Sequence, residues 1–516
     1  MVLAGPRASP LTRTGVPLAM VFCPMSESSL PVFHVIGFSG HRVVANPAAV
    51  QRVIGETLAA LCAERVGEWL ALASVAAGSD QIFVEEARRL GLSWHAILPL
   101  PKAEFARDFT AEDWVAVERF LVDAELVRVI TENGSRDDAY LDCGMETVNG
   151  ADVLMAVWDG LPAKGKGGTA DVVAYARALG KPIILIDSTT GEVRREHWER
   201  FGRADRILAN LNRLPAASSG WGDNPFKAPS FIFNFQQKCD FAASHGAPHV
   251  RRLVVLTVAL HVLATLVAAA SLAFEWHFLL VPWLKLLCLV GALGVAIVLR
   301  RHHHSQHSWV RCRLAAEFCR SALSTWGLPK ASPLFADLDL AGVRALTRSL
   351  SILHRRSASA QPVAMEDFRR IYLEKRVDDQ RAYYRKQEAR ALPLLGRLKL
   401  GFWVATLLAV AFTLLYGLHE TLHFAVPKPL VSLGFHFLPI ALPVIAASLI
   451  SLISINDLQR RVARYREMQV ILHDSRQQLA FSQTWNSLER IVLHTERALL
   501  QEVLEWHSLT SFTESH

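Results

Sequence analysis

The stretch ADVLMAVWDGLPAKGKGGTADVVA, residues 151–174, decides the fold class of the amino-terminal part of the chain. Val153–Trp158 is a short run of β-branched and apolar residues, which favours a central strand buried on both faces. A glycine-rich loop follows, and Thr169 can cap the helix that begins after it. This order of strand, loop and helix is typical of a phosphate-binding site, with an ordinary strand-to-helix turn as the alternative.

The residue types in this loop suit an anionic ligand. Gly167 and Gly168 have no Cβ atoms that would keep a ligand away from the backbone. Free amides in the first turn of the following helix favour an anion, and Lys164 and Lys166 add positive charge beside them. Asp171 lies in the same turn, so we include it among the candidate ligand-binding residues.

Strands and helices alternate around this stretch, which predicts a parallel sheet covered by helices on both faces. The expected strands are Val32–Phe38, Leu70–Ala76, Trp94–Leu100, Leu126–Thr131, Val153–Trp158 and Pro182–Asp187. The expected helices are Pro47–Arg65, Gln81–Leu90, Glu112–Glu125 and Ala170–Leu179. In such a sheet the ligand lies at the carboxyl ends of the strands.

Two further strand ends carry loops that suit a ligand. The candidate residues in them are Gly40, His41 and Arg42 after the first strand, and Gly78, Ser79 and Asp80 after the second. Arg42 can bind a phosphate through two hydrogen bonds. Asp80 can accept from ribose hydroxyls or cap its own helix, and His41 is more often a packed loop histidine than a catalyst. Because three such loops converge on one sheet edge, together they favour a ligand site.

Composition and charge point to a membrane rather than to nucleic acid. The chain has 516 residues, a net charge of +7 and a mean hydropathy of +0.22. Its arginines gather at the ends of apolar segments, as the arginines of membrane proteins do. Seven scattered cysteines without a CxxC pair indicate a reducing compartment.

Four apolar stretches are long enough to cross a bilayer as two hairpins. They are Leu253–Phe274, Phe278–Leu299, about Leu400–Leu418 and about Phe437–Ile455. Basic residues stand before the first span and after the second span of each hairpin, such as Arg251 and Arg301 in the first hairpin. The positive-inside rule therefore predicts a multi-pass membrane protein with both termini in the cytoplasm.

Two ionisable residues fall within the predicted spans. Lys285 lies in the second span, where it can snorkel to the interface, line a pore or pair with a buried partner. His261 lies near the cytoplasmic end of the first span, which favours an interfacial position over a proton relay. The sequence predicts no metal site and assigns no catalytic residue.

The amino-terminal motifs resemble those of a known superfamily. GFSGHR (37–42), VAAGSDQIFVEEARRLGL (75–92) and AVWDG with GKGGTADVVAYARALGKPIILID (156–160 and 165–187) are similar to the SLOG superfamily, which includes DprA-like proteins and the lonely-guy nucleotide phosphoribohydrolases. This resemblance implies a Rossmann-like fold that binds a nucleotide or an NAD-derived ligand. In the lonely-guy pattern PGGxGTxxE the catalytic glutamate falls at Val172 of this chain, so binding is expected rather than hydrolysis.

The helical segments resemble a second family. YLEKRVDDQRAYYRKQEAR (372–390), WVRCRLAAEFCRSAL (309–323) and WNSLERIVLHTERALLQEVLEW (485–506) are similar to SLATT domains, two-span effector modules that occur beside SLOG domains in bacterial conflict systems. The expected organisation is a disordered 1–31, a nucleotide-binding domain 32–190, linkers 191–230 and 331–364, and SLATT-like units 231–330 and 365–516.

These resemblances together imply a membrane effector of an antiphage or conflict system, in which a nucleotide-type signal triggers assembly or opening of a pore. The expected partners are that signal, the lipid bilayer and further copies of the chain, with no nucleic acid. One alternative is a membrane-anchored enzyme that cleaves or transfers on a nucleotide, using Asp80, Glu85 or Asp171. Another is an ion channel that is constitutive or regulated by the ligand.

Overall fold

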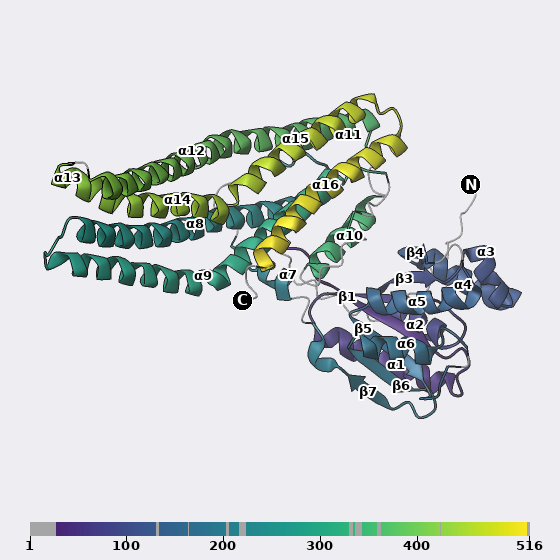
Figure 1. The fold of residues 1–516 in the computed structure, drawn as a ribbon. Helices are drawn as coiled ribbons and strands as arrows, with labels where there is room; N and C mark the ends of the chain where they lie inside the picture. The colour runs from purple at the N-terminus through teal and green to yellow at the C-terminus, as the bar shows by residue number, and fades with distance from the viewer. Residues whose placement is uncertain are drawn as a thin grey trace, which may run out of the picture.

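The computed structural model describes most of the chain, and Figure 1 shows its two parts: a sheet domain, and long helices that extend away from it. The described residues are 27–130, 134–163, 165–202, 206–215, 223–329, 334–335, 343–358, 363–423 and 425–512. Most of the amino-terminal segment expected to be disordered, and Lys164, lie outside them.

Seven strands form one sheet in the order β4-β3-β2-β1-β5-β6-β7. The strands are β1 (Phe33–Gly40), β2 (Glu68–Ala73), β3 (Ser93–Leu98), β4 (Leu126–Val129), β5 (Val153–Trp158), β6 (Ile183–Asp187) and β7 (Val193–Glu196). The parallel sheet predicted from the sequence is confirmed for β1 to β6. The antiparallel edge strand β7 was not expected, because its sequence VRRE is short and charged.

Helices cover both faces of this sheet. The helices on one face are α1 (Pro47–Glu64), α2 (Ser79–Arg89) and α4 (Ala111–Asp123), and those on the other are α5 (Arg136–Gly150) and α6 (Thr169–Ala178). A short α3 (Lys102–Phe105) precedes α4. The sequence did not indicate α5, because few of its residues are apolar, although Ser135 caps its first turn.

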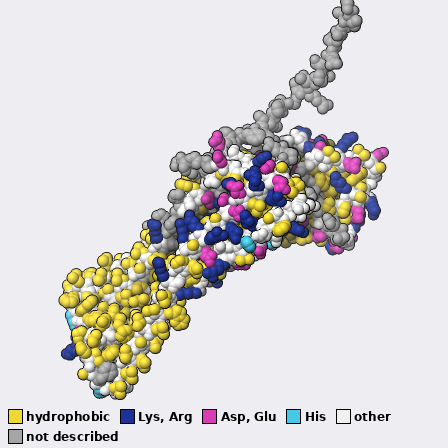
Figure 2. Space-filling model, turned by 90° about the horizontal axis from the view of Figure 1, so that it is seen from above, with side chains coloured by type: hydrophobic (Ala, Val, Ile, Leu, Met, Phe, Trp, Pro, Cys, Tyr) yellow, Lys and Arg dark blue, Asp and Glu magenta, His cyan; other side chains and the backbone are white. Residues whose placement is uncertain are grey.

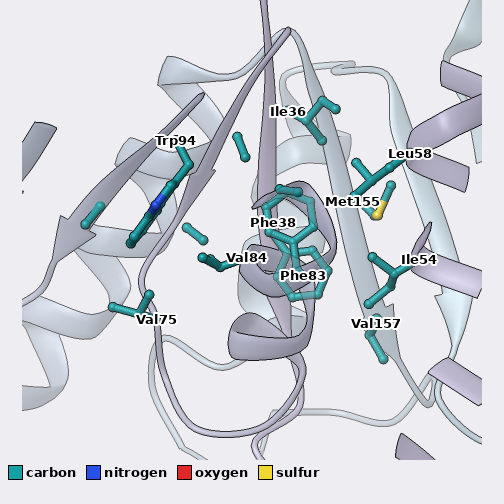
Figure 3. Packing of buried hydrophobic residues seen from close by; sticks show 14 of the residues in the cluster. Ile36, Phe38, Ile54, Leu58, Val75, Phe83, Val84, Trp94, Met155 and Val157 are labelled. Carbon is teal, nitrogen blue, oxygen red and sulfur yellow. The ribbon is translucent and has the colours of Figure 1, made fainter. Parts of the chain in front are cut away.

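The main core of the domain lies between the sheet and the face formed by α1 and α2. In Figure 3, Phe38 of β1 stacks on Phe83 of α2, with ring centroids 4.4 Å apart. Ile36, Met155 and Val157 continue this core along β1 and β5. Alternate residues of the same strands are buried on the opposite face, which explains why these strands read as unbroken apolar runs.

Four helices are long and apolar enough to cross a membrane, as predicted. The spans belong to α8 (Ser230–Ala273), α9 (Leu280–Ser324), α12 (Asp379–Leu422) and α14 (Leu438–Ile455), the last preceded by α13 (Lys428–Val431) and the π-helical η4 (Ser432–Phe437). α8 packs along α9 and α14, and α14 packs along α12, so the spans form a row in the order α9, α8, α14, α12 (Figure 1).

The surface of the row is apolar. Figure 2 shows hydrophobic side chains over the end of the molecule that the spans form, and charged side chains over the rest. Leu287, Trp403 and Leu407 are among the side chains exposed there. Burying such a surface in lipid removes the cost of its contact with water.

The remaining helices form the soluble end of the helical part. They are α7 (Arg206–Asn212), α10 (Arg344–Ala358), α11 (Met365–Tyr372), the π-helical η3 (Leu373–Asp378), α15 (Leu458–Phe481) and α16 (Trp485–Phe512). Helix α10 lies inside the segment that the sequence analysis treated as a linker. The segment after the fourth span is two helices, because Ser482 takes an extended conformation and Thr484 caps the next helix.

A buried ion pair of the second hairpin unit contacts the first unit at this soluble end. Arg376 of η3 donates to both carboxylate oxygens of Glu496 on α16, at 2.8 and 2.6 Å, and to the hydroxyl of Ser321 on α9, at 3.2 Å. The hydroxyl of Tyr372 also donates to Glu496, at 2.9 Å. Both charged side chains are at most 2% exposed, so neither can exchange its partner for water.

Replacing one member of this pair is predicted to destabilise the helical part. Arg376→Met leaves the Glu496 carboxylate buried without its counterion, a loss of about 3–5 kcal/mol. Adding Glu496→Met removes the orphaned charge, so the double variant should recover most of the loss. Thermal unfolding of the purified full-length chain in detergent measures both effects. Equal midpoints for the single variant and the unchanged protein would contradict the buried pair.

Candidate functional site

The loops after β1 and β2 are bound to each other at the carboxyl edge of the sheet. The amide and the hydroxyl of Ser79 both donate to the carbonyl of His41, at 3.1 and 2.9 Å. A Cβ atom at Gly40 would lie 2.2 Å from the Ser79 hydroxyl oxygen, so the contact requires glycine. Two loops predicted to converge therefore do so through their backbones.

The second loop has an unusual backbone. Gly78 has a φ of +90°, and a Cβ atom there would lie 2.2 Å from the carbonyl oxygen of Arg42. Val75, which is fully buried, has a φ of +55°, a strained conformation for a β-branched residue. Strain of this kind persists only where the surroundings impose it, and it gathers at ligand-binding sites.

Asp80 lies inside this loop, with 3% of its surface exposed. Its carboxylate accepts from the Ser74 hydroxyl at 2.5 Å. Burial raises its pKa to about 6, although Ser74, the amides of Ala76 and Gly40, and the charge of Arg42 oppose the rise. Asp80 does not cap its own helix as expected, because the N-cap of α2 is Gly78 and no side chain bonds to it. Its buried carboxylate instead fixes the start of α2 to the loops, a position that does not favour contact with a ligand.

The glycine-rich loop is partly bonded internally. Gly167 has a φ of +81°, and its amide donates to the carboxylate of Asp171 at 2.9 Å. The Gly168 amide donates to the carbonyl of Gly165 at 3.3 Å. Within the described residues the amides of Thr169 and Ala170 have no acceptor, so these two can receive an anion at the start of α6.

Helix α5 holds the positive side chains around these loops. Lys166 forms an ion pair with Asp138, and both side chains are about half exposed. This pair lowers the pKa of Asp138 and raises that of Lys166. The exposed guanidinium of Arg42 lies over the ring of Tyr140, with its central carbon 5.2 Å from the ring centroid. Arg42 and Lys166 therefore belong to one surface, although different loops carry them.

Asp159, at the carboxyl end of β5, was not singled out from the sequence. Its carboxylate lies 3.1 Å from Nε2 of His41, and each side chain is about 30% exposed. The amide of Leu161, burial of the carboxylate and His41 all act on the pKa of Asp159, with the net effect of lowering it. β1 and β5 are the neighbours at which the order of the sheet reverses, the usual ligand position in such folds. The sequence signal that could have identified Asp159 was its position directly after the predicted strand Val153–Trp158.

The carboxylates named for an enzymatic alternative lie in unlike surroundings. Asp80 is buried, Asp171 accepts from Gly167, and Glu85 pairs with Arg88 on the surface of α2. Val172, at the position of the lonely-guy glutamate, is 1% exposed and packs toward Gly144 of α5. Position 172 therefore points between two helices rather than at the loops.

The two intramembrane polar residues make different contacts. The ammonium of Lys285 on α9 donates to the hydroxyl of Ser271 on α8 at 3.1 Å, which joins the two spans of the first hairpin. Nδ1 of His261 lies 2.8 Å from the carbonyl of Thr257 one turn earlier in its own helix. Between α12 and α14 an apolar groove of 1190 Å³ is lined by large apolar residues such as Leu414, together with small residues and threonines such as Ala409 and Thr413.

Comparison with known families identifies the helical part. Residues 234–384 match the SMODS and SLOG-associating 2TM effector domain 3, and residues 372–506 match the SMODS and SLOG-associating 2TM effector domain 1. The chain thus contains two SLATT domains in tandem, which confirms the resemblance of its helical segments. With the four apolar helices, the matches indicate a membrane protein. They do not reach the sheet domain, and no curated protein matches the chain.

The burial of Asp80 leads to a predicted pH dependence. Because its folded pKa of about 6 exceeds the ordinary value of 3.8, this group stabilises the fold below pH 4 relative to neutral pH. About 2–3 kcal/mol should be lost as the pH rises from 4 through 6. Asp80→Asn should be more stable than the unchanged protein at pH 7.5 and equally stable at pH 4, as measured by unfolding of the full-length chain. A difference that does not change with pH would be the contrary result.

Proposed function

We propose that this protein is a membrane effector that binds a nucleotide-type signal at the carboxyl edge of its sheet and responds through its tandem SLATT domains. The arrangement of the three loops supports the first half of this proposal most directly. They meet where β1 and β5 end, and their glycines permit contacts that a Cβ atom would block. The family of the helical part supports the second half.

The chemistry of the loops fits a phosphorylated nucleoside. The amides of Thr169 and Ala170, with Lys166 and Arg42 nearby, suit a phosphate group. Asp159 suits the hydroxyl groups of a ribose, because an ionised carboxylate only accepts hydrogen bonds. The bound species is then a nucleotide or an NAD-derived molecule, held at the β1–β5 junction.

The membrane response requires further copies of the chain or a rearrangement of its spans. In a single chain the four spans form an open row, with α9 and α12 at its ends. An open row does not surround a water-filled path, so a pore needs further copies or a rearrangement of the spans. Small residues along the α12–α14 groove, such as Ala409 and Gly417, allow another helix to approach closely. The signal controls this step only if it binds two states of the protein with different affinity.

The proposed setting is the bacterial inner membrane, with both termini in the cytoplasm. Figure 1 shows the turns of both hairpins at the end of the molecule that lies away from the sheet domain, so the soluble parts share one side. Arg252, Arg300 and Arg397 lie at the soluble ends of the spans, which favours the cytoplasm for that side. Defence against phage through damage to the host membrane follows from the SLATT resemblance.

A membrane-anchored enzyme that processes a nucleotide is the second candidate. The pairing of Asp159 with His41 at the exposed junction favours it, since such a pair can move a proton. Incubating the full-length protein with NAD, AMP and cyclic nucleotides distinguishes the two proposals. Product formation supports the enzyme, and tight binding without turnover supports the sensor.

Gly168→Asp is predicted to abolish both nucleotide binding and toxicity. The new carboxylate adds negative charge at the start of α6, and its Cβ atom would lie 2.9 Å from that of Ala163. Ala60→Asp is the control, because it adds the same charge at an exposed position of α1, away from the loops. Equilibrium dialysis with the nucleotides above, growth of expressing cells and the membrane-bound fraction are measured for each variant. Unchanged toxicity of the Gly168 variant would refute the proposal.

A further inference from the structure

Helix α10 lies across the amino-terminal edge of the sheet, opposite the proposed ligand site. Arg348 donates to the carbonyl of Phe33 at 3.1 Å and forms an ion pair with Asp152, which directly precedes β5. At the other end of the helix, Arg356 pairs with Glu68 at 2.7 Å and with Glu125 at 3.2 Å. These partners stand at the start of β1, β5, β2 and β4, and Arg356 also donates to the hydroxyl of Ser93, the first residue of β3, at 3.2 Å, so one helix contacts five strands.

The same helix packs into the helical part through apolar side chains. Leu346 and Leu350 are at most 1% exposed and belong to the cluster formed with α8, α9 and α16. The ring of His354 stacks on Trp326, just after α9, at a centroid distance of 4.8 Å. Ile352 is buried on the opposite side, against the sheet. α10 therefore connects the sheet domain to the helices that continue into the spans.

The two sides of α10 differ in how readily they can separate. Toward the sheet the contacts of α10 are mainly polar: the ion pairs of Arg348 and Arg356, and beside them Nε of Arg355, a buried atom without a hydrogen-bond partner within the described part of the chain. A buried polar atom without a partner is unfavourable, and contact with water relieves it. Toward the helical part the contacts are apolar, and separating them exposes leucines to water. Ile352 is buried against the sheet, whereas Ala345, Leu346 and Leu350 are buried toward the helical part, so separation at the sheet exposes less apolar surface and is the easier of the two.

The carboxylates of the sheet that face α10 are ionised, so they attract Arg356 while α10 is in contact with the sheet. Burial raises the pKa of Glu125, but its contacts with His95 and Arg356 outweigh this effect and hold the pKa at about 2. The carboxylates of Glu68 and Glu125 are exposed enough to accept water in place of Arg356, with 39% and 18% of their side chains accessible. If Arg356 moves away, the attraction is lost, but water can hydrate Glu68 and Glu125, so neither carboxylate is left buried without a partner.

We propose that α10 is a releasable latch: its ion pairs to the amino ends of the strands hold the spans in the open row, and activation requires α10 to leave the sheet while staying packed on the helical part. This inference rests on the proposed function for what activation does. Beyond that function, it identifies the contact between α10 and the sheet as the restraint on the effector. The ligand loops and the latch lie at opposite ends of β1, β2 and β5, so a change in how these strands pack can reach both.

Charge reversal at the centre of the latch tests this inference on the full-length protein. Arg356→Glu replaces two attractions with two repulsions, and Arg356→Glu combined with Glu68→Arg restores one attraction. Arg195→Glu is the matched control, because Arg195 pairs with Glu64 at a similar exposure on the far edge strand β7, away from α10. Each protein is reconstituted in calcein-loaded vesicles of phosphatidylethanolamine and phosphatidylglycerol, and hydrogen exchange is followed over residues 344–358.

The Arg356→Glu variant should exchange its α10 amides about tenfold faster than the unchanged protein and release calcein without any nucleotide. The double variant should reverse both effects in part, and the Arg195 control should show neither. If α10 exchanges at its original rate, the ion pairs do not hold it and the inference fails. If α10 loosens and the vesicles stay sealed, release of α10 does not activate the spans and the inference also fails. Sensing is judged separately by the Gly168 variant, whose nucleotide binding does not involve α10.

Discussion

A helix that crosses lipid must satisfy every backbone hydrogen bond within itself, and this constraint shapes the whole molecule. α8 and α9 each run without a break from the soluble end through the span, over 44 and 45 residues. At 1.5 Å per residue each is about 66 Å long. A rigid helix of this length carries a displacement at its soluble end into the bilayer. The contacts at that end, Arg376 with Glu496 and α10 with the sheet, are therefore the places where the state of the spans can be set.

In the proposed function, the two edges of the sheet domain separate sensing from transmission. At its carboxyl edge Ser79 bonds the loops after β1 and β2 to each other, and Asp171 bonds the glycine-rich loop to the start of α6, which leaves the amides of Thr169 and Ala170 with charged groups around them. Its amino edge carries carboxylates that receive the arginines of α10. The β-strands between the two edges form the stiff core of the domain (Figure 3). A ligand at one edge and a latch at the other then act on the same strands without sharing a residue.

The sequence predicted the elements whose signal is local. The six parallel strands are buried on both faces, so each reads as an apolar run, and the spans read as long uncharged stretches. α5, α10 and β7 were not predicted, because their sequences are polar or charged and they are held by partners distant in the chain. Asp138 on α5 pairs with Lys166, and Arg356 on α10 pairs with Glu68, contacts that no local pattern encodes. The break at Ser482 was hidden inside a continuous helical pattern.

What the sequence determined by itself was the class of each part: a parallel sheet with glycine-rich loops at its carboxyl edge, and two apolar hairpins flanked by arginine. These classes follow from the periodicity and composition of apolar residues, which are local properties of the sequence. Only the tertiary structure decided that Asp80 turns inward, that Asp159 meets His41, and that a presumed linker forms the helix between the two parts. Each of these depends on where distant strands and helices come to lie, because a polar side chain is placed by the partner that satisfies it.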